Sequence, residues 1–105
     1  MAELVVNGVS YALDEDGFLE DASVWNEDVA KALAPNEEVE ELTDAHWKVI
    51  NYLRDYYDQF GVSPMVRKLL KDTGYTNATI YELFPTGPGK GACKIAGLPK
   101  PTGCV

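Results

Sequence analysis

The sequence predicts a mainly α protein: a small helical bundle with an N-terminal β-hairpin, a helix-turn-helix-like unit and a flexible C-terminal arm. Asn7-Gly8 lies between two short apolar runs, and both residues tolerate the positive φ of a hairpin turn. Apolar residues recur every three or four positions over 44–60, as in a helix that buries one face. Residues 85–105 contain five glycines and four prolines, which favours a mobile arm. With 105 residues and 46% apolar content, we expect one core, in a domain over 1–84.

Two elements are expected before the long helix. The hairpin strands fall at 4–6 and 10–13, on either side of the turn. A first helix then begins at a cap on Asp21 or Ser23. It ends near Leu33, because a proline and an asparagine follow shortly after.

The longest helix is expected over 44–60. Thr43 is a good N-cap for it, and Gly61 supplies its stop. The residues expected to face the core form one stripe: Trp47, Ile50, Leu53, Tyr57 and Phe60. The acidic run over 37–41, which precedes this helix, is expected to be a solvated loop with no assigned role.

The stretch 64–84 predicts two short helices joined by a turn. Ser63 caps the first helix, Pro64 opens it, and Thr76 caps the second. The arrangement resembles a helix-turn-helix unit. The second helix has neither Lys nor Arg and carries an acidic residue, unlike the recognition helix of a DNA-binding protein. The pattern therefore argues against nucleic acid as its partner.

Charge is distributed unevenly along the chain. The net charge is −8, yet residues 1–65 hold fifteen acidic and three basic residues, whereas residues 66–105 hold two acidic and six basic ones. An acidic body is repelled by a phosphate backbone, which again disfavours nucleic acid. Arg67, Lys68 and Lys71 form the basic cluster of the body, which is either a solvated face or a docking surface for an acidic partner.

No segment of the sequence indicates secretion or membrane insertion. The first residues lack a basic stretch followed by a long apolar one, and no run approaches the roughly eighteen apolar residues of a membrane span. We therefore expect a cytoplasmic protein with no membrane insertion. In a reducing cytosol two cysteines rarely form a structural disulfide, so we expect their oxidation to be functional.

Both cysteines, Cys93 and Cys104, lie in the predicted arm, and Cys104 is the penultimate residue. A cysteine reacts as its thiolate, which nearby positive charge favours. Lys90 and Lys94 flank Cys93, and Lys100 is near Cys104. These residues predict thiol chemistry, and two exposed thiols without a function are the alternative interpretation.

Metal or nucleotide binding is not expected. A structural zinc site takes four ligands, and the chain offers two cysteines and His46, which is distant from them in sequence. His46 is instead expected to be a capping or surface residue. The glycine-rich stretch 87–91 lacks the spacing and the Ser or Thr of a phosphate-binding loop, and it follows a predicted helix rather than a strand.

Several segments together carry a resemblance to a known family. They are the Asn7-Gly8 hairpin, DEDGFLED, LTDAHWKVINYLRDYY, SPMVRKLLK and GPGKGACKIAGLPKPTGC. Over nearly its whole length the chain resembles the small sulfur-carrier proteins of the DsrC and TusE type, which include the gamma protein of dissimilatory sulfite reductase. In that family the penultimate cysteine carries sulfur, which maps to Cys104. Only the DsrC branch adds a second arm cysteine, which maps to Cys93.

The resemblance implies a sulfur-carrying redox co-substrate of dissimilatory sulfite reductase, acting with its alpha and beta subunits rather than as an independent catalyst. Cys104 would accept sulfur from partly reduced sulfite. A trisulfide or disulfide with Cys93 would then be re-reduced by a membrane-bound electron-transfer complex. The chain itself would bind no cofactor, because siroheme and iron–sulfur clusters belong to the reductase. Two alternatives stay open: a sulfur-relay carrier for tRNA thiolation, and a helix-turn-helix regulatory or structural subunit.

Overall fold

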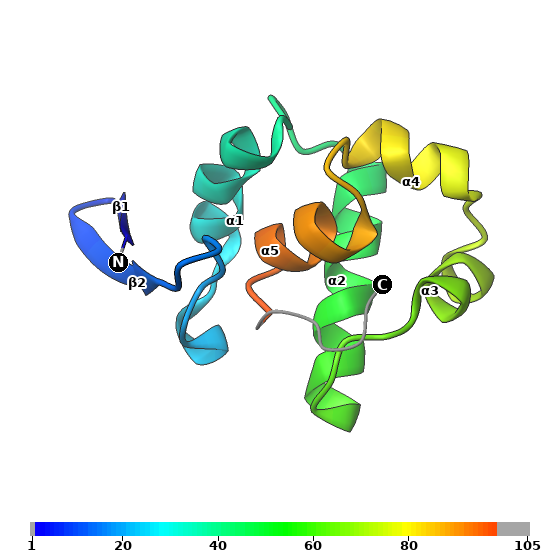
Figure 1. Ribbon diagram of the computed structural model, residues 1–105, viewed down its shortest axis with the longest axis horizontal. Helices are drawn as coiled ribbons and strands as arrows, with labels where there is room; N and C mark the ends of the chain where they lie inside the picture. Colours follow the sequence, from blue (N-terminus) through cyan, green and yellow to red (C-terminus); the bar gives the residue numbers. More distant parts are fainter. Residues whose placement is uncertain (1, 99–105) are drawn as a thin grey trace.

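The computed structural model describes residues 2–98 and has the predicted fold class, a small helical bundle with an N-terminal hairpin (Figure 1). Its elements are, by type, the strands β1 (Ala2–Val6) and β2 (Val9–Leu13), the helices α1 (Glu27–Leu33), α2 (Asp44–Phe60), α3 (Val66–Thr73), α4 (Asn77–Leu83) and α5 (Cys93–Ile95), the 3-10 turns η1 (Ala22–Val24) and η2 (Ala34–Glu37), and the π-helical turn η3 (Pro88–Ala92).

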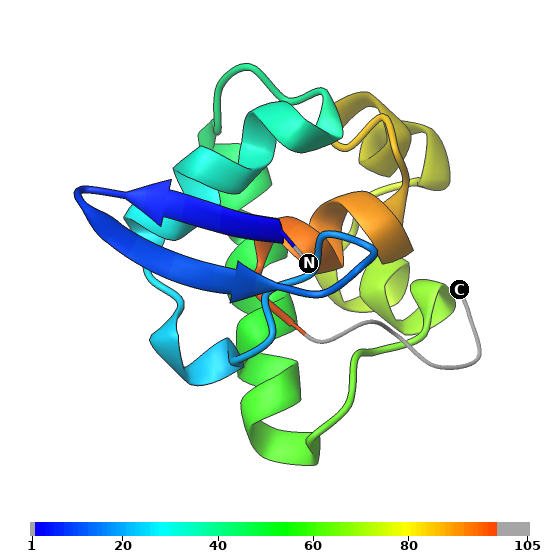
Figure 2. The same cartoon turned by 60° about the vertical axis from the view of Figure 1, so that its left-hand side comes forward.

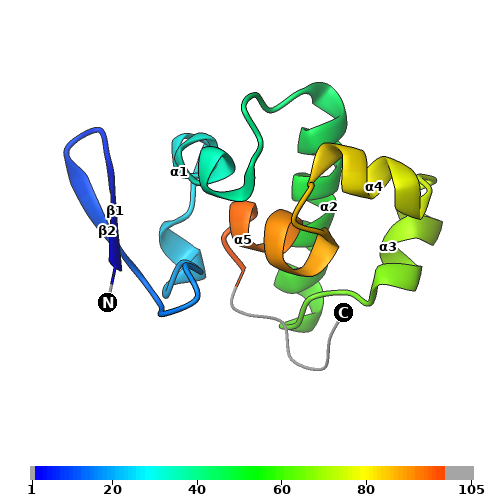
Figure 3. The same ribbon diagram turned by 45° about the horizontal axis from the view of Figure 1, so that its top comes forward.

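The hairpin forms where the Asn-Gly pair predicts it. Asn7 and Gly8 have φ values of 51° and 80°, which bring Val6 opposite Val9 in an antiparallel register. The hairpin lies at one end of the molecule (Figure 3), and β1 packs against α1. Figure 2, which brings this side forward, shows the strands lying across α1.

The first helix begins later than predicted, at Glu27, and its N-cap is Asn26 rather than Asp21 or Ser23. The Asn26 side chain accepts the Val29 N–H at 2.9 Å and so caps α1. The Asp21 carboxylate instead accepts the N–H and hydroxyl of Ser23, at 3.0 and 2.6 Å, in the turn at η1. Asp21 and Ser23 both have side chains that can cap a helix, but here they are hydrogen-bonded to each other in a local turn.

The long helix α2 has the predicted bounds, with Thr43 as N-cap and Gly61 as C-cap. The residues it buries are His46, Val49, Ile50 and Leu53. The predicted stripe is wrong at its end, since Phe60 is 60% exposed. The last turn of α2 extends beyond α5 (Figure 1), so little covers it. Across residues 2–98 no helix, α2 included, is long and apolar enough to cross a membrane.

The two short helices follow as predicted, with one difference at the start of the first. α3 begins at Val66, because Met65 still has an extended backbone with ψ 152°. Ser63 does not cap it, since the Ser63 hydroxyl is hydrogen-bonded to the thiol of Cys93. Thr76 caps α4 as predicted and accepts the N–H of Thr79 at 3.2 Å.

The segment 85–98 differs most from the sequence prediction. We expected a mobile arm from Pro85, but η3 and α5 lie in the centre of the molecule, between α1 and α2 (Figure 1). The side chains that this segment buries include Ala92, Cys93, Ile95, Ala96 and Leu98. Its glycines permit close packing rather than freedom: a Cβ on Gly91 would come within 2.6 Å of the Thr86 hydroxyl. The predicted site residues Lys100 and Cys104 lie outside the described residues.

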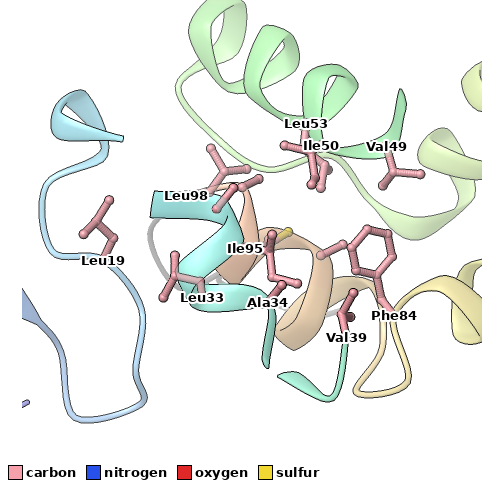
Figure 4. Packing of buried hydrophobic residues seen from close by; sticks show 14 of the residues in the cluster. Leu19, Leu33, Ala34, Val39, Val49, Ile50, Leu53, Phe84, Ile95 and Leu98 are labelled. Carbon is pink, nitrogen blue, oxygen red and sulfur yellow. The ribbon is translucent and has the colours of Figure 1, made fainter. Parts of the chain in front are cut away.

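Figure 4 shows how this segment completes the core. Ile95 and Leu98 point from the C-terminal segment into a cluster whose other members include Leu33, Ala34, Ile50, Leu53 and Phe84. Both side chains are fully buried, and each contributes about 1.5–3 kcal/mol of hydrophobic stabilisation relative to exposure. The body of the protein therefore extends at least to Leu98.

Candidate thiol site

Cys93 is the first residue of α5, and its thiol is buried in the core. The side chain is 3% exposed. Burial raises the pKa of the thiol to about 11, and the hydrogen bond from Ser63 opposes this only in part. The thiol is therefore protonated at neutral pH, which contradicts the expectation that neighbouring lysines would activate it.

Lys94 is held by a carboxylate that lies far away in sequence. Its ammonium Nζ is 2.9 Å from Oε2 of Glu37, and both side chains are largely buried. The Thr86 hydroxyl donates to Oε1 of Glu37 at 2.8 Å. The ammonium also lies 5.1 Å from the centre of the Phe18 ring. The charge of Lys94 is thus compensated by Glu37, and this ion pair ties α5 to η2.

Sequence reasoning missed the part that Glu37 plays. The run 37–41 was expected to be a solvated loop, but Glu37 and Val39 are buried. An acidic run does not reveal which of its carboxylates meets a distant base. The sequence held no signal for this pair, because Lys90, Lys94 and Lys100 all lie in a stretch without acidic residues and only the fold shows which of them meets a carboxylate.

The C-terminal end of α5 is closed by a complete Schellman motif. The N–H of Leu98 donates to the carbonyl of Cys93 at 3.1 Å, and the N–H of Gly97 donates to the carbonyl of Lys94 at 3.0 Å. Gly97 has the left-handed φ of 73° that this motif requires. The chain therefore reaches Leu98 directly beside the backbone of Cys93.

Two side chains from other elements hold the same end of α5. The indole N–H of Trp25 donates to the carbonyl of Ile95 at 2.9 Å, and Nη1 of Arg54 donates to the carbonyl of Ala96 at 2.9 Å. The Arg54 guanidinium also stacks on the Trp25 ring, 4.3 Å from its centre. Sequence reasoning assigned no functional role to either residue, because the contacts join segments that are far apart in the chain.

His46 is a capping residue, as predicted, but it is buried rather than on the surface. Its Nδ1 accepts the Thr43 N–H at 3.0 Å. The ring hydrogen therefore lies on Nε2, which donates to the carbonyl of Leu83 at 2.7 Å. Both ring nitrogens are engaged. Within residues 2–98, no group of three or more His, Cys, Asp or Glu side chains is placed to hold a metal ion.

The chain matches the model of a protein family described as DsrC like protein over residues 5–105. The chain belongs to this DsrC-like family. It is 50% identical to the gamma subunit of dissimilatory-type sulfite reductase from Nitratidesulfovibrio vulgaris, over 100% of both chains. It is 44% identical to a sulfurtransferase TusE homolog from Haemophilus influenzae, over 97% of this chain and 99% of that protein.

Solved structures agree with this assignment. The crystal structure of the oxidized gamma subunit of dissimilatory sulfite reductase (DsrC) from Archaeoglobus fulgidus is similar with a TM-score of 0.92 and 51% identity, over 99% of this chain and 100% of that one. The NMR structure of DsrC from Allochromatium vinosum is similar with a TM-score of 0.87 and 42% identity, over 100% of both. The family resemblance expected from the sequence segments is confirmed.

In this DsrC-like chain the predicted site residues are only partly placed. Cys93 and Lys94 lie at the start of α5, and Lys94 pairs with Glu37. The supporting role predicted for Lys90 stays a prediction, as do the roles of Lys100 and Cys104.

Proposed function

We propose that this chain is a sulfur-carrying protein co-substrate of dissimilatory sulfite reductase, in which Cys104 accepts sulfur and Cys93 closes a bridge to it. The observation that carries the proposal is the hydrogen bond from the Leu98 N–H to the Cys93 carbonyl. This hydrogen bond places Leu98 beside the backbone of Cys93. The second cysteine, Cys104, follows Leu98 by six residues. The similarity to a gamma subunit and to sulfurtransferases supports the same chemistry.

The length of chain beyond Leu98 permits both steps. Six residues reach at most about 20 Å when extended, at roughly 3.4 Å per residue. A bridge requires the two cysteine Cα atoms to approach within about 7 Å of each other. Cys104 can therefore extend into the site of a partner protein and can also return to Cys93, whose position is fixed by α5.

The burial of Cys93 supports a role as the second thiol to react. Protonated and covered, it does not compete with Cys104 for incoming sulfur. It loses its proton and its cover only when the bridge is formed. The two thiols thus act in sequence, first Cys104 and then Cys93.

Sulfite reduced by two electrons, written S(OH)2, condenses with two thiols to give a trisulfide and two water molecules. Four electrons and four protons then convert the trisulfide into two thiols and hydrogen sulfide. We propose that a membrane-bound electron-transfer complex supplies these electrons. The reaction takes place in the cytoplasm, with siroheme and iron–sulfur clusters held by the alpha and beta subunits of the reductase.

Mass spectrometry of the carrier after turnover tests this proposal. The alpha and beta subunits are supplied with sulfite, limiting electrons and either wild-type carrier, Cys104→Ala or Cys93→Ala. Wild type should gain one sulfur and lose two hydrogens. Cys93→Ala should form an S–OH adduct at Cys104, which two further electrons and two protons from the reductase convert into a persulfide and water, so that it gains one sulfur with no change in hydrogens. Cys104→Ala should gain no sulfur. Loading of Cys104→Ala to the wild-type level would overturn the assignment of the acceptor.

A second candidate is a sulfur-relay carrier for tRNA thiolation, which the similarity to a TusE homolog favours. Such a carrier uses the terminal thiol alone, as a persulfide. It predicts that Cys93→Ala passes sulfur to an acceptor protein as efficiently as wild type. Loss of the bridged product in Cys93→Ala, together with slower release of sulfide, favours the co-substrate instead.

A further inference from the structure

The last turn of α5 is held by groups that do not belong to it. The final carbonyls of a helix have no partner within the helix. Here the carbonyls of Ile95 and Ala96 accept hydrogen bonds from Trp25 and Arg54, at 2.9 Å in both cases. The donors come from the segment before α1 and from α2, so two distant elements meet at the point where the C-terminal residues begin.

Trp25 and Arg54 act as one unit. The Arg54 guanidinium lies 4.3 Å from the centre of the Trp25 ring, which orders both side chains. The backbone of Gly97 packs directly against the Trp25 indole, so closely that a Cβ added at Gly97 would overlap the ring. With Leu98 fully buried next to Gly97, the end of α5 has no room to shift.

This arrangement fixes how many residues lie between the folded body and Cys104. With the end of α5 held in place, residues 99–103 separate Leu98 from Cys104. If that end were released while Glu37 still held Lys94, residues 95–103 would separate Lys94 from Cys104, nearly twice as many. Effective concentration falls roughly as the −3/2 power of the length of the connecting chain, so this lengthening lowers it about two- to threefold. Loss of orientation lowers it further.

We propose that Trp25 and Arg54 are positioning residues for bridge formation: by holding the end of α5 they set the effective concentration of the Cys104 sulfur at Cys93. The inference rests on the proposed function in one respect, that the two cysteines react with each other. It needs no reductase, so its test is independent of sulfur loading.

Glutathione disulfide is a suitable probe, because each step of its reaction is a balanced exchange. The Cys104 thiolate attacks it, releases one glutathione thiolate and forms a mixed disulfide. The Cys93 thiolate then attacks the Cys104 sulfur, releases the second glutathione thiolate and closes the bridge. Acid-quenched samples analysed by mass spectrometry resolve the two steps.

The quantity to compare is the effective concentration. It is the rate constant of bridge closure divided by the second-order rate constant of Cys93 with glutathione disulfide, measured in the Cys104→Ala background. This division removes any change in the exposure of Cys93 itself. Trp25→Phe and Arg54→Met should lower the ratio about three- to tenfold, with the first exchange at Cys104 unchanged, and Arg54→Lys should restore part of the loss.

The chain offers matched controls for both substitutions. Trp47→Phe alters a half-buried indole away from α5, on α2, and Arg67→Met removes a guanidinium from an exposed position on α3. Neither should change the ratio. An unchanged ratio in Trp25→Phe and Arg54→Met, or an equal fall in the controls, would overturn the proposal. If Arg54→Met fails to fold, Trp25→Phe and Arg54→Lys decide the matter in the same assay.

Discussion

The burial of a single sulfur atom, that of Cys93, leads us to expect that the two thiols of this protein react unequally. Cys93 is buried and protonated at neutral pH, with a pKa of about 11. We therefore expect brief, substoichiometric iodoacetamide at about pH 7.5 to label Cys104 at least tenfold faster than Cys93, because a buried, protonated thiol reacts slowly. Peptide mapping measures the ratio. In denaturant the two rates should converge, and preferential labelling of Cys93 in the folded protein would contradict the buried position of its thiol.

The same thiol makes stability depend on alkaline pH. An unfolded cysteine has a pKa of 9.0, whereas burial raises the pKa of Cys93 in the folded protein to about 11. Between these two pKa values only the unfolded state releases the thiol proton. The contribution of Cys93 to the free energy of unfolding is therefore complete below pH 9 and is lost as the pH rises to 11. The loss is about 2–3 kcal/mol.

Denaturant titrations of wild type and Cys93→Ala between pH 7 and 11 measure this contribution. The difference between their unfolding free energies should shrink through that window, because alanine has no proton to release. A constant difference would show that Cys93 does not titrate above the unfolded value.

Among the contacts between elements, the buried ion pair of Glu37 and Lys94 is expected to matter most for stability. Removing one partner of a buried pair leaves the other charge uncompensated, which typically costs about 3–5 kcal/mol. Lys94→Met should show this loss in urea denaturation. Lys68→Met is the matched control, since it breaks the exposed pair of Lys68 with Asp72 and should cost less than about 1 kcal/mol. Similar losses in both variants would contradict the assignment.

Elements with local signals could be predicted from the sequence. The hairpin follows from Asn7-Gly8, and α2 follows from its caps Thr43 and Gly61, because each signal acts within a few residues. The start of α1 could not be chosen correctly, because Asp21 and Asn26 have similar capping chemistry and only the surrounding packing distinguishes them.

The thiol site was predictable only in part. The family segments identify both cysteines, and the packing of 85–98 stayed hidden because it depends on distant partners. The contact from Trp25 spans 70 residues and that from Glu37 spans 57. In the sequence, a glycine-rich stretch suggests a flexible backbone. In the structure, the missing side chains of Gly91 and Gly97 allow close contact with neighbouring side chains.

For the whole molecule, the point where the body ends can be tested by truncation. Removing residues 99–105 keeps all of 2–98, so we expect the Tm to change by less than about 5 °C. Removing 97–105 also deletes the buried Leu98 and the Schellman closure of α5. That truncation should cost roughly 2–5 kcal/mol, as for other buried leucines, and lower the Tm well beyond 5 °C in a thermal melt. Equal melting temperatures would place the end of the body before Gly97.

The long sequence separation of the contacts at α5 has a consequence for synthesis. A ribosome makes the N-terminal hairpin and α1 early, but their partners around Ile95 emerge almost last. Contacts between distant parts of a chain form slowly, because the intervening loop must close first. The nascent protein therefore spends its synthesis without the segment that completes its core. Cys93 belongs to this late segment, so an oxidant reaches its thiol most easily in the interval between release of the chain and the packing of α5 into the core.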